Sequence, residues 1–507
     1  MGEREVESIL SLTSKRFHDL LEQKQVIFII SNSTVDGIIS SSLLFDSIYR
    51  LGGSAVIRCI DSTNHLNVKE KIKDLLNEGH YSYIFLNFDS DLHNYINGLI
   101  AQEYFLFINT DANATDQQIL NQRENATFLS LNTLRNNSNL KVISTTSAFV
   151  YLLVKEFDKK VVQKSYLPIV AEISRIAVTD KHDTKNVNAE ILQTAINLNL
   201  LEIKKGLTFV DKQTSSIIDA IQNNTIHFIK GLTWNKQAVT EILKQSEIPF
   251  IENKRLKSLA ELEDKDYDRI VNSIEKFVEE NSFSNKKKEE DITDIKKRMR
   301  DKLLTYNYLL THEESNSILK GAHSFSRVLE SCINKKNFGT ALAISLGDRS
   351  SLVAEVQNQI QADNNTIKKI GLRIFTEKWR FYEDNEILFV NGEGILDEED
   401  IDQFANLIGK SISFVNKIIC LRTSGTENQE SYKYNLISGD PFVFDLNRIT
   451  DKIEEFMENH NPLTTGRSNV KLLYDSGVTR IEIIVPIEKL EVFLSNIKKI
   501  VMYARIT

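Results

Sequence analysis

The sequence predicts an α/β protein with a doubly wound parallel-sheet domain, an inserted charged helical module and a second, smaller α/β domain. Short apolar runs alternate with helical periodicity early in the chain, and the alternation returns after about residue 366, as in parallel sheets covered by helices. The charged stretch between them keeps one apolar face, which is typical of an exposed helical module. A chain of 507 residues is too long for one core, so we expect domains at residues 1–215, 216–365 and 366–507.

The first domain is expected to begin with an amphipathic helix at residues 1–24, where apolar side chains recur at helical spacing. Continuous apolar runs then predict buried strands, and helical spacing predicts the helices between them. The strands are expected at residues 26–30, 54–60, 83–88 and 104–108, and the helices at 38–49 and 68–77.

The pattern from about residue 142 to 230 is helical, and residues 255–320 are strongly charged with helical spacing. Such a charge run is usually a solvated face; because both signs interleave, a nucleic-acid or protein partner is the weaker alternative. Trp234 and Trp379 are expected to be core or semi-buried packing residues. The last domain is expected to hold four strands and a closing helix, at residues 386–390, 417–421, 432–437, 480–485 and 490–500.

Composition and charge exclude several classes of protein. The net charge of −8 argues against a protein whose entire surface binds polyanions. A local basic groove is still compatible with this charge. Three widely spaced cysteines, Cys59, Cys332 and Cys420, cannot form a disulfide framework or a cysteine-rich zinc site, which favours a reducing cytoplasm. The apolar runs are strand-sized, so no membrane span is expected.

Aspartates follow several of the expected strands, among them Asp36, Asp89 and Asp111. In a doubly wound sheet the residues just past the strand ends face the ligand crevice. Carboxylates there are what a two-metal phosphoester hydrolase needs, because hard oxygen ligands hold two Mn²⁺ or Mg²⁺ ions about 4 Å apart and activate water.

The order and spacing of these segments resemble the DHH phosphoesterases, in particular their RecJ-like archaeal branch. The resemblance covers nearly the whole chain and implies a DHH domain and a smaller DHHA1-like domain. Residues 322–349 resemble the interdomain helix and turn of that branch. The family has four sequence motifs that supply its metal ligands. In this chain they correspond to residues 32–41, Asp89, residues 109–111 and Thr179-Asp180.

This chain departs from the family where the metal ligands are expected. Asn32 and Thr34 stand in place of first-motif ligands, and Asn109 and Thr110 stand in the Asp-His-His motif. Neutral amide and hydroxyl oxygens are poor anchors for a divalent cation. The resemblance therefore implies lost ligands and no resident cofactor.

Four aspartates mark the remnant metal-site positions, namely Asp36, Asp89, Asp111 and Asp180. Three of them, Asp36, Asp89 and Asp180, would hold at most a single weak cation. In the carboxyl-terminal domain the family has a Gly-Gly-Gly-His segment that clamps a substrate phosphate. Here Gly466 is the remaining glycine and Arg467 stands in place of the His, so these two form a remnant phosphate clamp.

Ordinary structural roles compete with each of these interpretations. Asp36 before a glycine could cap a helix, and residues 89–91 and 109–111 could be simple loops or turns. His182 is more commonly a surface histidine than a metal ligand, and Arg467 could pair with a surface carboxylate instead of a phosphate.

A RecJ-like fold without its metals resembles the archaeal group related to the cell-division-cycle protein forty-five, an accessory subunit of the replicative helicase. This resemblance implies a catalytically inactive scaffold, cytoplasmic and nucleoid-associated, that binds GINS and the MCM helicase and guides single-stranded DNA. The alternative is a metal-dependent 5′→3′ single-strand exonuclease associated with GINS. A phosphodiesterase of short oligonucleotides is a third hypothesis, which the eroded clamp disfavours.

Overall fold

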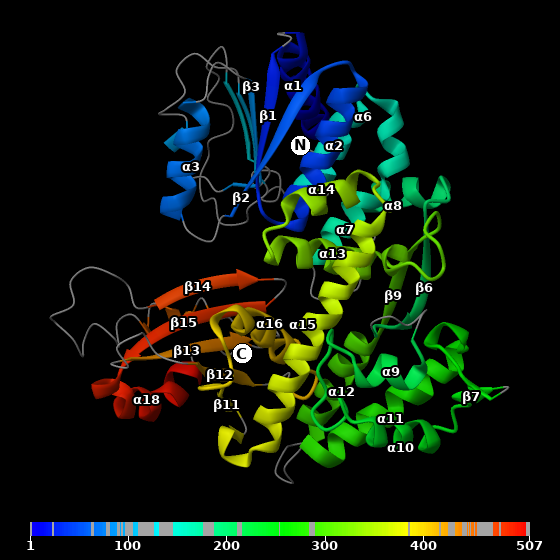
Figure 1. The fold of residues 1–507 in the computed structure, drawn as a ribbon, viewed down its shortest axis with the longest axis vertical. Coiled ribbons are helices and arrows are strands. Elements are labelled where there is room, and N and C mark those ends of the chain that lie inside the picture. The colour runs from blue at the N-terminus through cyan, green and yellow to red at the C-terminus, as the bar shows by residue number, and fades with distance from the viewer. Residues whose placement is uncertain are drawn as a thin grey trace. The chain divides into compact units, whose positions relative to one another are not determined.

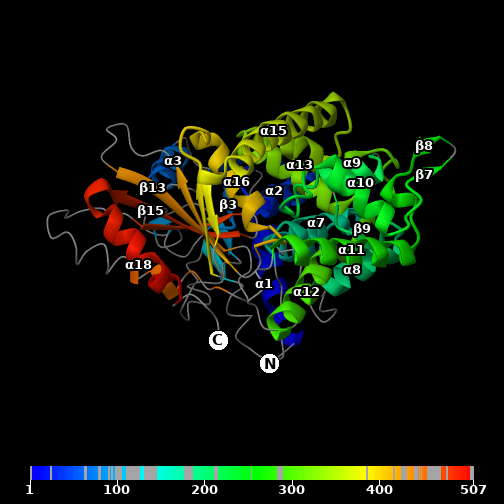
Figure 2. The same cartoon turned by 90° about the horizontal axis from the view of Figure 1, so that it is seen from below.

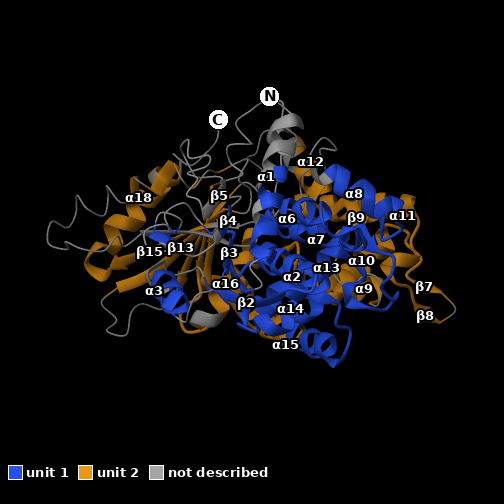
Figure 3. Ribbon diagram, turned by 90° about the horizontal axis from the view of Figure 1, so that it is seen from above, with its two compact units in different colours: residues 1–176, 180–204, 308–360 blue, residues 177–179, 205–307, 361–507 orange. Residues whose placement is uncertain are grey.

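The chain forms two compact units that are interleaved in sequence. Unit 1 comprises residues 1–176, 180–204 and 308–360, and unit 2 comprises residues 177–179, 205–307 and 361–507 (Figure 3). Residues 308–360 lie in the predicted interdomain range but belong to the amino-terminal unit. The domain ranges 1–215, 216–365 and 366–507 stay a prediction. The computed structural model describes residues 3–22, 25–61, 65–77, 82–88, 92, 95–96, 105–109, 126–130, 145–175, 187–209, 215–252, 254–282, 289–383, 386–414, 417–423, 431–438, 444, 446, 448–450, 452–453, 470–475 and 478–502.

Unit 1 is built on a parallel sheet with the strand order β2-β1-β3-β4-β5 (Figure 1). Ile29 in the centre of β1 pairs with Ile57 of β2 and with Ile84 of β3. This confirms the predicted α/β class and the parallel sheet. The strands are β1 Val26–Asn32, β2 Ser54–Ile60, β3 Ser82–Leu86, β4 Phe105–Asn109 and β5 Ala126–Ser130.

Helices cover this sheet, and α2 (Val35–Arg50) is the most buried of those around the site. It packs against α6 (Thr146–Lys155), α7 (Tyr166–Arg175) and α14 (Phe338–Leu346), and Ile38, Leu43 and Leu44 are inaccessible to solvent. The burial of these apolar side chains fixes α2 against its neighbouring helices. The other helices of the unit are α1 Glu3–Glu22, α3 His65–Asn77, η1 Lys159–Lys164, α8 Val187–Asn197, η3 Ile318–Lys320 and α13 Ala322–Asn334.

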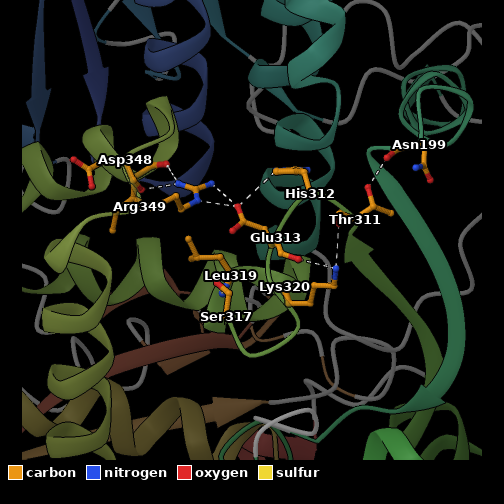
Figure 4. A network of polar contacts seen from close by, with 10 residues as sticks. Asn199, Thr311, His312, Glu313, Ser317, Leu319, Lys320, Asp348 and Arg349 are labelled. Atoms are coloured by element: carbon orange, nitrogen blue, oxygen red, sulfur yellow. Dashed lines mark hydrogen bonds and ion pairs between the residues drawn. The ribbon is translucent and has the colours of Figure 1, made fainter.

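A polar network in unit 1 centres on Glu313 (Figure 4). Its Oε1 lies 2.8 Å from Arg349 Nε and 2.6 Å from Nη2, and the Glu313 carbonyl accepts a hydrogen bond of 2.9 Å from Lys320 Nζ. Burial lowers the pKa of the adjacent His312 more than the Glu313 carboxylate raises it, which favours the neutral imidazole. The network therefore fastens the turn after β9 (Leu304–Leu310) to the segment that follows α14.

Unit 2 contains the predicted helical module, with its own apolar core around Ile270, Ile274 and Met299. The prediction of a helical pattern was wrong at two places, because β6 (Leu201–Leu207) and β9 are strands of a two-stranded sheet, whose residues are divided between the two units. The β-branched and aromatic residues of β9, Thr305, Tyr306 and Tyr308, favour a strand there. Of the charge run, residues 283–288 lie outside the described part. The module's elements are α9 Ile217–Gln222, α10 Lys236–Gln245, β7 Ile251–Glu252, β8 Arg255–Leu256, η2 Leu259–Glu261, α11 Asp264–Ser282 and α12 Glu289–Leu303.

The carboxyl-terminal part of unit 2 is a mixed sheet with the order β10-β11-β12-β13-β15-β14, in which β11 and β12 are parallel. Ile387 and Leu388 of β11 belong to different apolar clusters, because neighbouring strand residues face opposite sides. Figure 2 shows α18 on one side of the sheet and α16 with α15 on the other. The elements are the part of α15 (Ser351–Thr376) that follows residue 360, η4 Lys378–Arg380, β10 Phe381–Glu383, β11 Ile387–Asn391, α16 Glu398–Gly409, β12 Ile418–Thr423, β13 Ser431–Ser438, β14 Val470–Asp475, β15 Val478–Pro486, η5 Ile487–Lys489 and α18 Leu490–Met502.

The two tryptophans of this unit differ from each other. Trp234 is partly buried against Phe228, as expected, with ring centroids 5.5 Å apart. The prediction for Trp379 was wrong, because this side chain is 67% exposed. No helix among the described residues has the length and apolar character needed to cross a membrane.

Candidate functional site

The candidate site lies where β1 and β3 of unit 1 end. The chain runs from β1 through α2 to β2 on one side, and then through α3 to β3 on the other side of β1. Ligand crevices of doubly wound sheets lie at such switch points, outside the carboxyl ends of the strands. Asn32 is the last residue of β1, and Asn87 follows β3 directly.

Four neutral side chains, Asn32, Thr34, Asn87 and Thr146, bind one another at this position; we call them the Asn–Thr cluster. Asn32 Oδ1 accepts hydrogen bonds from Thr34 Oγ1 at 2.8 Å and from Asn87 Nδ2 at 3.1 Å. Thr146 Oγ1 lies 3.2 Å from Asn87 Oδ1 and donates to it. Asn87 adopts a left-handed backbone conformation with φ 63°, which asparagine tolerates better than most residues. Each of the four side chains therefore has at least one hydrogen-bond partner within the cluster.

The start of α2 is fixed by the same segment. Thr34 is its N-cap residue, and Thr34 Oγ1 accepts a hydrogen bond of 3.0 Å from the Gly37 backbone N–H. A Cβ atom on Gly37 would lie 2.6 Å from Asn32 Oδ1 and still closer to the Asn32 carbonyl oxygen. Glycine thus permits the close approach of α2 to the end of β1.

Gly37→Ala is expected to lower the free energy of unfolding by about 1–3 kcal/mol, because the added methyl group overpacks the end of β1. Urea unfolding followed by circular dichroism measures the change. Gly339→Ala in α14 is the matched control: nothing lies within 4 Å of its Cβ position, so it should be neutral or slightly stabilising. Equal stability of Gly37→Ala and the unmodified chain would contradict the close approach.

Asp36 connects α2 to the start of α6. Its carboxylate is 2% exposed, and its two oxygens accept backbone hydrogen bonds of 2.9 Å, one from Thr146 N and one from Ser147 N. The third free donor of α6, Ala148 N, is bound by the side chain of Thr145 at 3.2 Å. A carboxylate at a helix N-terminus satisfies orphan N–H groups and the positive end of the helix dipole. Asp36 thus stabilises α6, whereas Thr34 caps α2.

Of the predicted positions, Asn32 and Thr34 contact each other, and Asp36 is linked to the cluster through the backbone of Thr146. Asn109 ends β4, where only its backbone is described. Among the residues that are described, no three His, Cys, Asp or Glu side chains lie close enough to hold a metal ion. The predicted positions outside the described residues are Asp89, Asp91, Thr110, Asp111, Asp180, His182, Gly466 and Arg467.

Sequence reasoning missed Asn87 and residues 145–147 as parts of the site. Asn87 had a signal, because it is a polar residue directly after a buried strand and ahead of Asp89. Thr145, Thr146 and Ser147 had a weaker one: hydroxyl residues before an apolar helical run are typical of a helix start. Their contact with Asp36 spans more than a hundred residues of sequence, and no local pattern indicates it.

Comparison with solved structures identifies the fold. The crystal structure of CDC45 from Entamoeba histolytica aligns over 99% of this chain and 99% of its own, with 10% sequence identity and a TM-score of 0.62. This alignment shows that the chain has the CDC45 fold, and it confirms the fold that the resemblance predicted. Two RecJ structures with manganese, one from Thermus thermophilus, align over 99% of this chain and over 54% and 94% of their own. Both have 9% identity and a TM-score of 0.48. No protein-family model and no curated protein sequence matches the chain.

Proposed function

We propose that this chain is a catalytically inactive scaffold of the DNA replication machinery. In this proposal it associates with GINS and the MCM helicase, stabilises the helicase complex and guides single-stranded DNA. The observation that carries the proposal is the Asn–Thr cluster, which occupies the switch point where a hydrolase of this fold would hold its metals.

The chemistry of the cluster supports inactivity. Hard divalent cations are held by carboxylates, and a two-metal centre needs several of them close together. At the ends of β1 and β3 the described side chains are amides and hydroxyls that bind one another, with Asn32 only 9% exposed. A metal bound by Asn32 Oδ1 would have to displace the Thr34 and Asn87 hydrogen bonds, and the four side chains of the cluster would offer it only neutral ligands.

The hydrogen bonds that Asp36 accepts also support the proposal that the chain is catalytically inactive. Both of its oxygens already accept charge-assisted bonds from the α6 backbone, which are stronger than neutral hydrogen bonds. Turning the carboxylate toward a metal would leave two buried N–H groups without acceptors.

The rival function is a metal-dependent 5′→3′ single-strand exonuclease. Its support is the set of remaining aspartates, Asp36, Asp89, Asp111 and Asp180, which would have to hold metals in an altered arrangement. The two functions differ in whether the chain turns over DNA.

Digestion of 5′-labelled single-stranded DNA and RNA in Mn²⁺ or Mg²⁺ separates them, with Asp89→Ala as the control variant. We expect no cleavage above that control, because the cluster supplies no charged ligand. Processive loss of substrate that disappears in Asp89→Ala would establish a working metal site and overturn the inactive-scaffold proposal.

The proposed association with GINS and the MCM helicase is tested separately. Size-exclusion chromatography of the chain with GINS and MCM from the same organism should give a complex that contains all three. Elution of the chain apart from both partners would contradict the association, whatever the nuclease assay shows.

A further inference from the structure

The second half of α15 carries an exposed leucine among basic residues. Ile367, Ile370 and Ile374 of this helix are buried in one apolar cluster of unit 2. At 3.6 residues per turn, Leu372 lies on the opposite side of α15, where it is 41% exposed. Residues three or four positions from Leu372 lie on the same side of a helix. Those of α15 are all exposed, namely Lys369, Arg373 and Thr376.

Trp379 in η4 is joined to this side of α15 through Glu377. Arg373 Nε lies 3.3 Å from Glu377 Oε1, and Arg380 Nε lies 2.6 Å from Glu377 Oε2. The Arg380 guanidinium in turn lies against the indole, with Cζ 4.1 Å from the ring centroid. This row of contacts connects the exposed side of the helix with the Trp379 ring. We call Lys369, Leu372, Arg373, Thr376 and Trp379 the outer α15 surface.

The Trp379 ring has a fixed support but is open to solvent. Arg380 is only 6% exposed, and its Nη1 donates to the carbonyl oxygens of Asn391 at 3.2 Å and Glu393 at 2.9 Å. Trp379 itself is 67% exposed. An ordered aromatic ring loses little conformational freedom when a partner covers it.

Positive charge is concentrated on this part of the chain. Residues 364–380 contain five basic residues and one acidic residue, although the whole chain carries −8. The acidic residue is Glu377, which is already paired with Arg373 and Arg380. Lys369 is exposed and has no ion-pair partner among the residues that the structure describes. The outer α15 surface therefore combines apolar side chains with an excess of cations.

We propose that the outer α15 surface binds an acidic amphipathic helix of a partner protein. Apolar side chains of that helix pack on Leu372 and Trp379, and its carboxylates face Lys369 and Arg373. The local charge favours an acidic partner, and tryptophan is among the residues that contribute most to binding at interfaces. The inference goes beyond the scaffold proposal, because it concerns a different surface and holds whether or not the chain binds GINS and MCM.

A helix is the suitable occupant because the outer α15 surface is itself largely helical. The backbone N–H and C=O groups within α15 bond to one another, so a partner cannot add a strand to them. The side chains of a second helix can instead pack between those of α15. Nucleic acid is the less suitable ligand, because it would leave Leu372 without an apolar contact.

Tryptophan fluorescence of the full chain tests the contact directly. The probe is a synthetic peptide of about 14 residues that lacks tryptophan, with leucines at helical spacing and glutamates and alanines between them. Of the two tryptophans, Trp234 is already packed against Phe228. A change in emission therefore reports mainly on Trp379. We expect the peptide to shift the emission to shorter wavelength, and the shift to be absent in Trp379→Ala.

Calorimetric titration of variants with the same peptide tests the apolar anchors. Leu372→Ala and Trp379→Ala should each weaken binding by about tenfold, the effect of losing a central anchor. Leu256→Ala in β8 is the matched control, because Leu256 is 42% exposed and belongs to the same unit. It should bind like the unmodified chain, and all three variants should keep its circular dichroism spectrum.

A charge reversal tests the cationic part of the surface. Lys369→Glu should weaken binding by about fivefold and reduce its dependence on salt, because one attractive contact becomes repulsive. Lys244→Glu, at an exposed position of α10, changes the net charge equally and should bind like the unmodified chain. Equal affinity of these two variants would show that net charge alone attracts the peptide, which would overturn the proposal.

Three further results would also overturn the proposal. The first is equal binding of a peptide in which alanine replaces every leucine, which would assign the cations to any polyanion, nucleic acid included. The second is equal affinity of Leu372→Ala and Leu256→Ala. The third is emission that does not shift at peptide concentrations up to about 1 mM, where even weak complexes form.

Discussion

Asp36→Ala is expected to destabilise unit 1 by about 2–5 kcal/mol, because it leaves two buried backbone donors without an acceptor, at about 1–3 kcal/mol each. Thr146 and Ser147, whose N–H groups bind the Asp36 oxygens at 2.9 Å, are both inaccessible to solvent. The first turn of α6 should therefore loosen first.

The measurement is urea unfolding, combined with hydrogen–deuterium exchange of the peptide that contains the start of α6. Asp36→Asn keeps one acceptor and should fall between Asp36→Ala and the unmodified chain. Asp74→Ala, on the exposed side of α3, is the matched control and should change stability by less than about 0.5 kcal/mol.

Metal dependence distinguishes a structural carboxylate from a ligand. If Asp36 stabilises α6 as the structure shows, the loss in Asp36→Ala is the same in EDTA and in excess Mn²⁺. A loss that appears only with Mn²⁺ present would instead mean that Asp36 holds a cation in the folded chain, since a bound ion adds stability by mass action.

Glu313→Ala is the second substitution with a large expected effect. Breaking a buried ion pair by removing one partner costs about 3–5 kcal/mol, because the other charge stays without compensation. The Glu313 side chain is 6% exposed, but Arg349 is 31% exposed, so water screens part of its charge. We therefore expect a loss near the lower limit, about 3 kcal/mol.

The result is read from the urea midpoint of the full chain. Glu313→Gln keeps an acceptor for Arg349 but removes the charge, so it should lose less than Glu313→Ala. Glu314→Ala is the control, because Glu314 is the exposed neighbour on the same turn (Figure 4 shows the network around Glu313). A Glu313→Ala protein as stable as Glu314→Ala would show that Arg349 finds another partner.

The order of elements around the strand-end site could be predicted from sequence because buried strands and amphipathic helices differ in hydrophobic period. The strand expected at residues 26–30 extends to Asn32, and the helix expected at residues 68–77 begins at His65. The prediction of a helical pattern was wrong at β6 and β9. The short runs of polar and apolar residues there show no clear hydrophobic period. The prediction that Trp379 is buried or semi-buried was also wrong. Exposure beside a sheet edge depends on which strand forms that edge, and the sequence alone does not show the strand order.

The sequence by itself determined the α/β class, the parallel sheet and the position of Asn32, Thr34 and Asp36 at a strand end, because these depend on local periodicity and on the rule that strand ends meet at one edge. Only the tertiary structure decided what the three side chains do. The partners of Asp36 and Asn32 come from α6 and from the end of β3, which are distant in sequence. A carboxylate next to those N–H groups stabilises a helix, whereas the same carboxylate next to other carboxylates would bind a metal; its neighbours in space determine which.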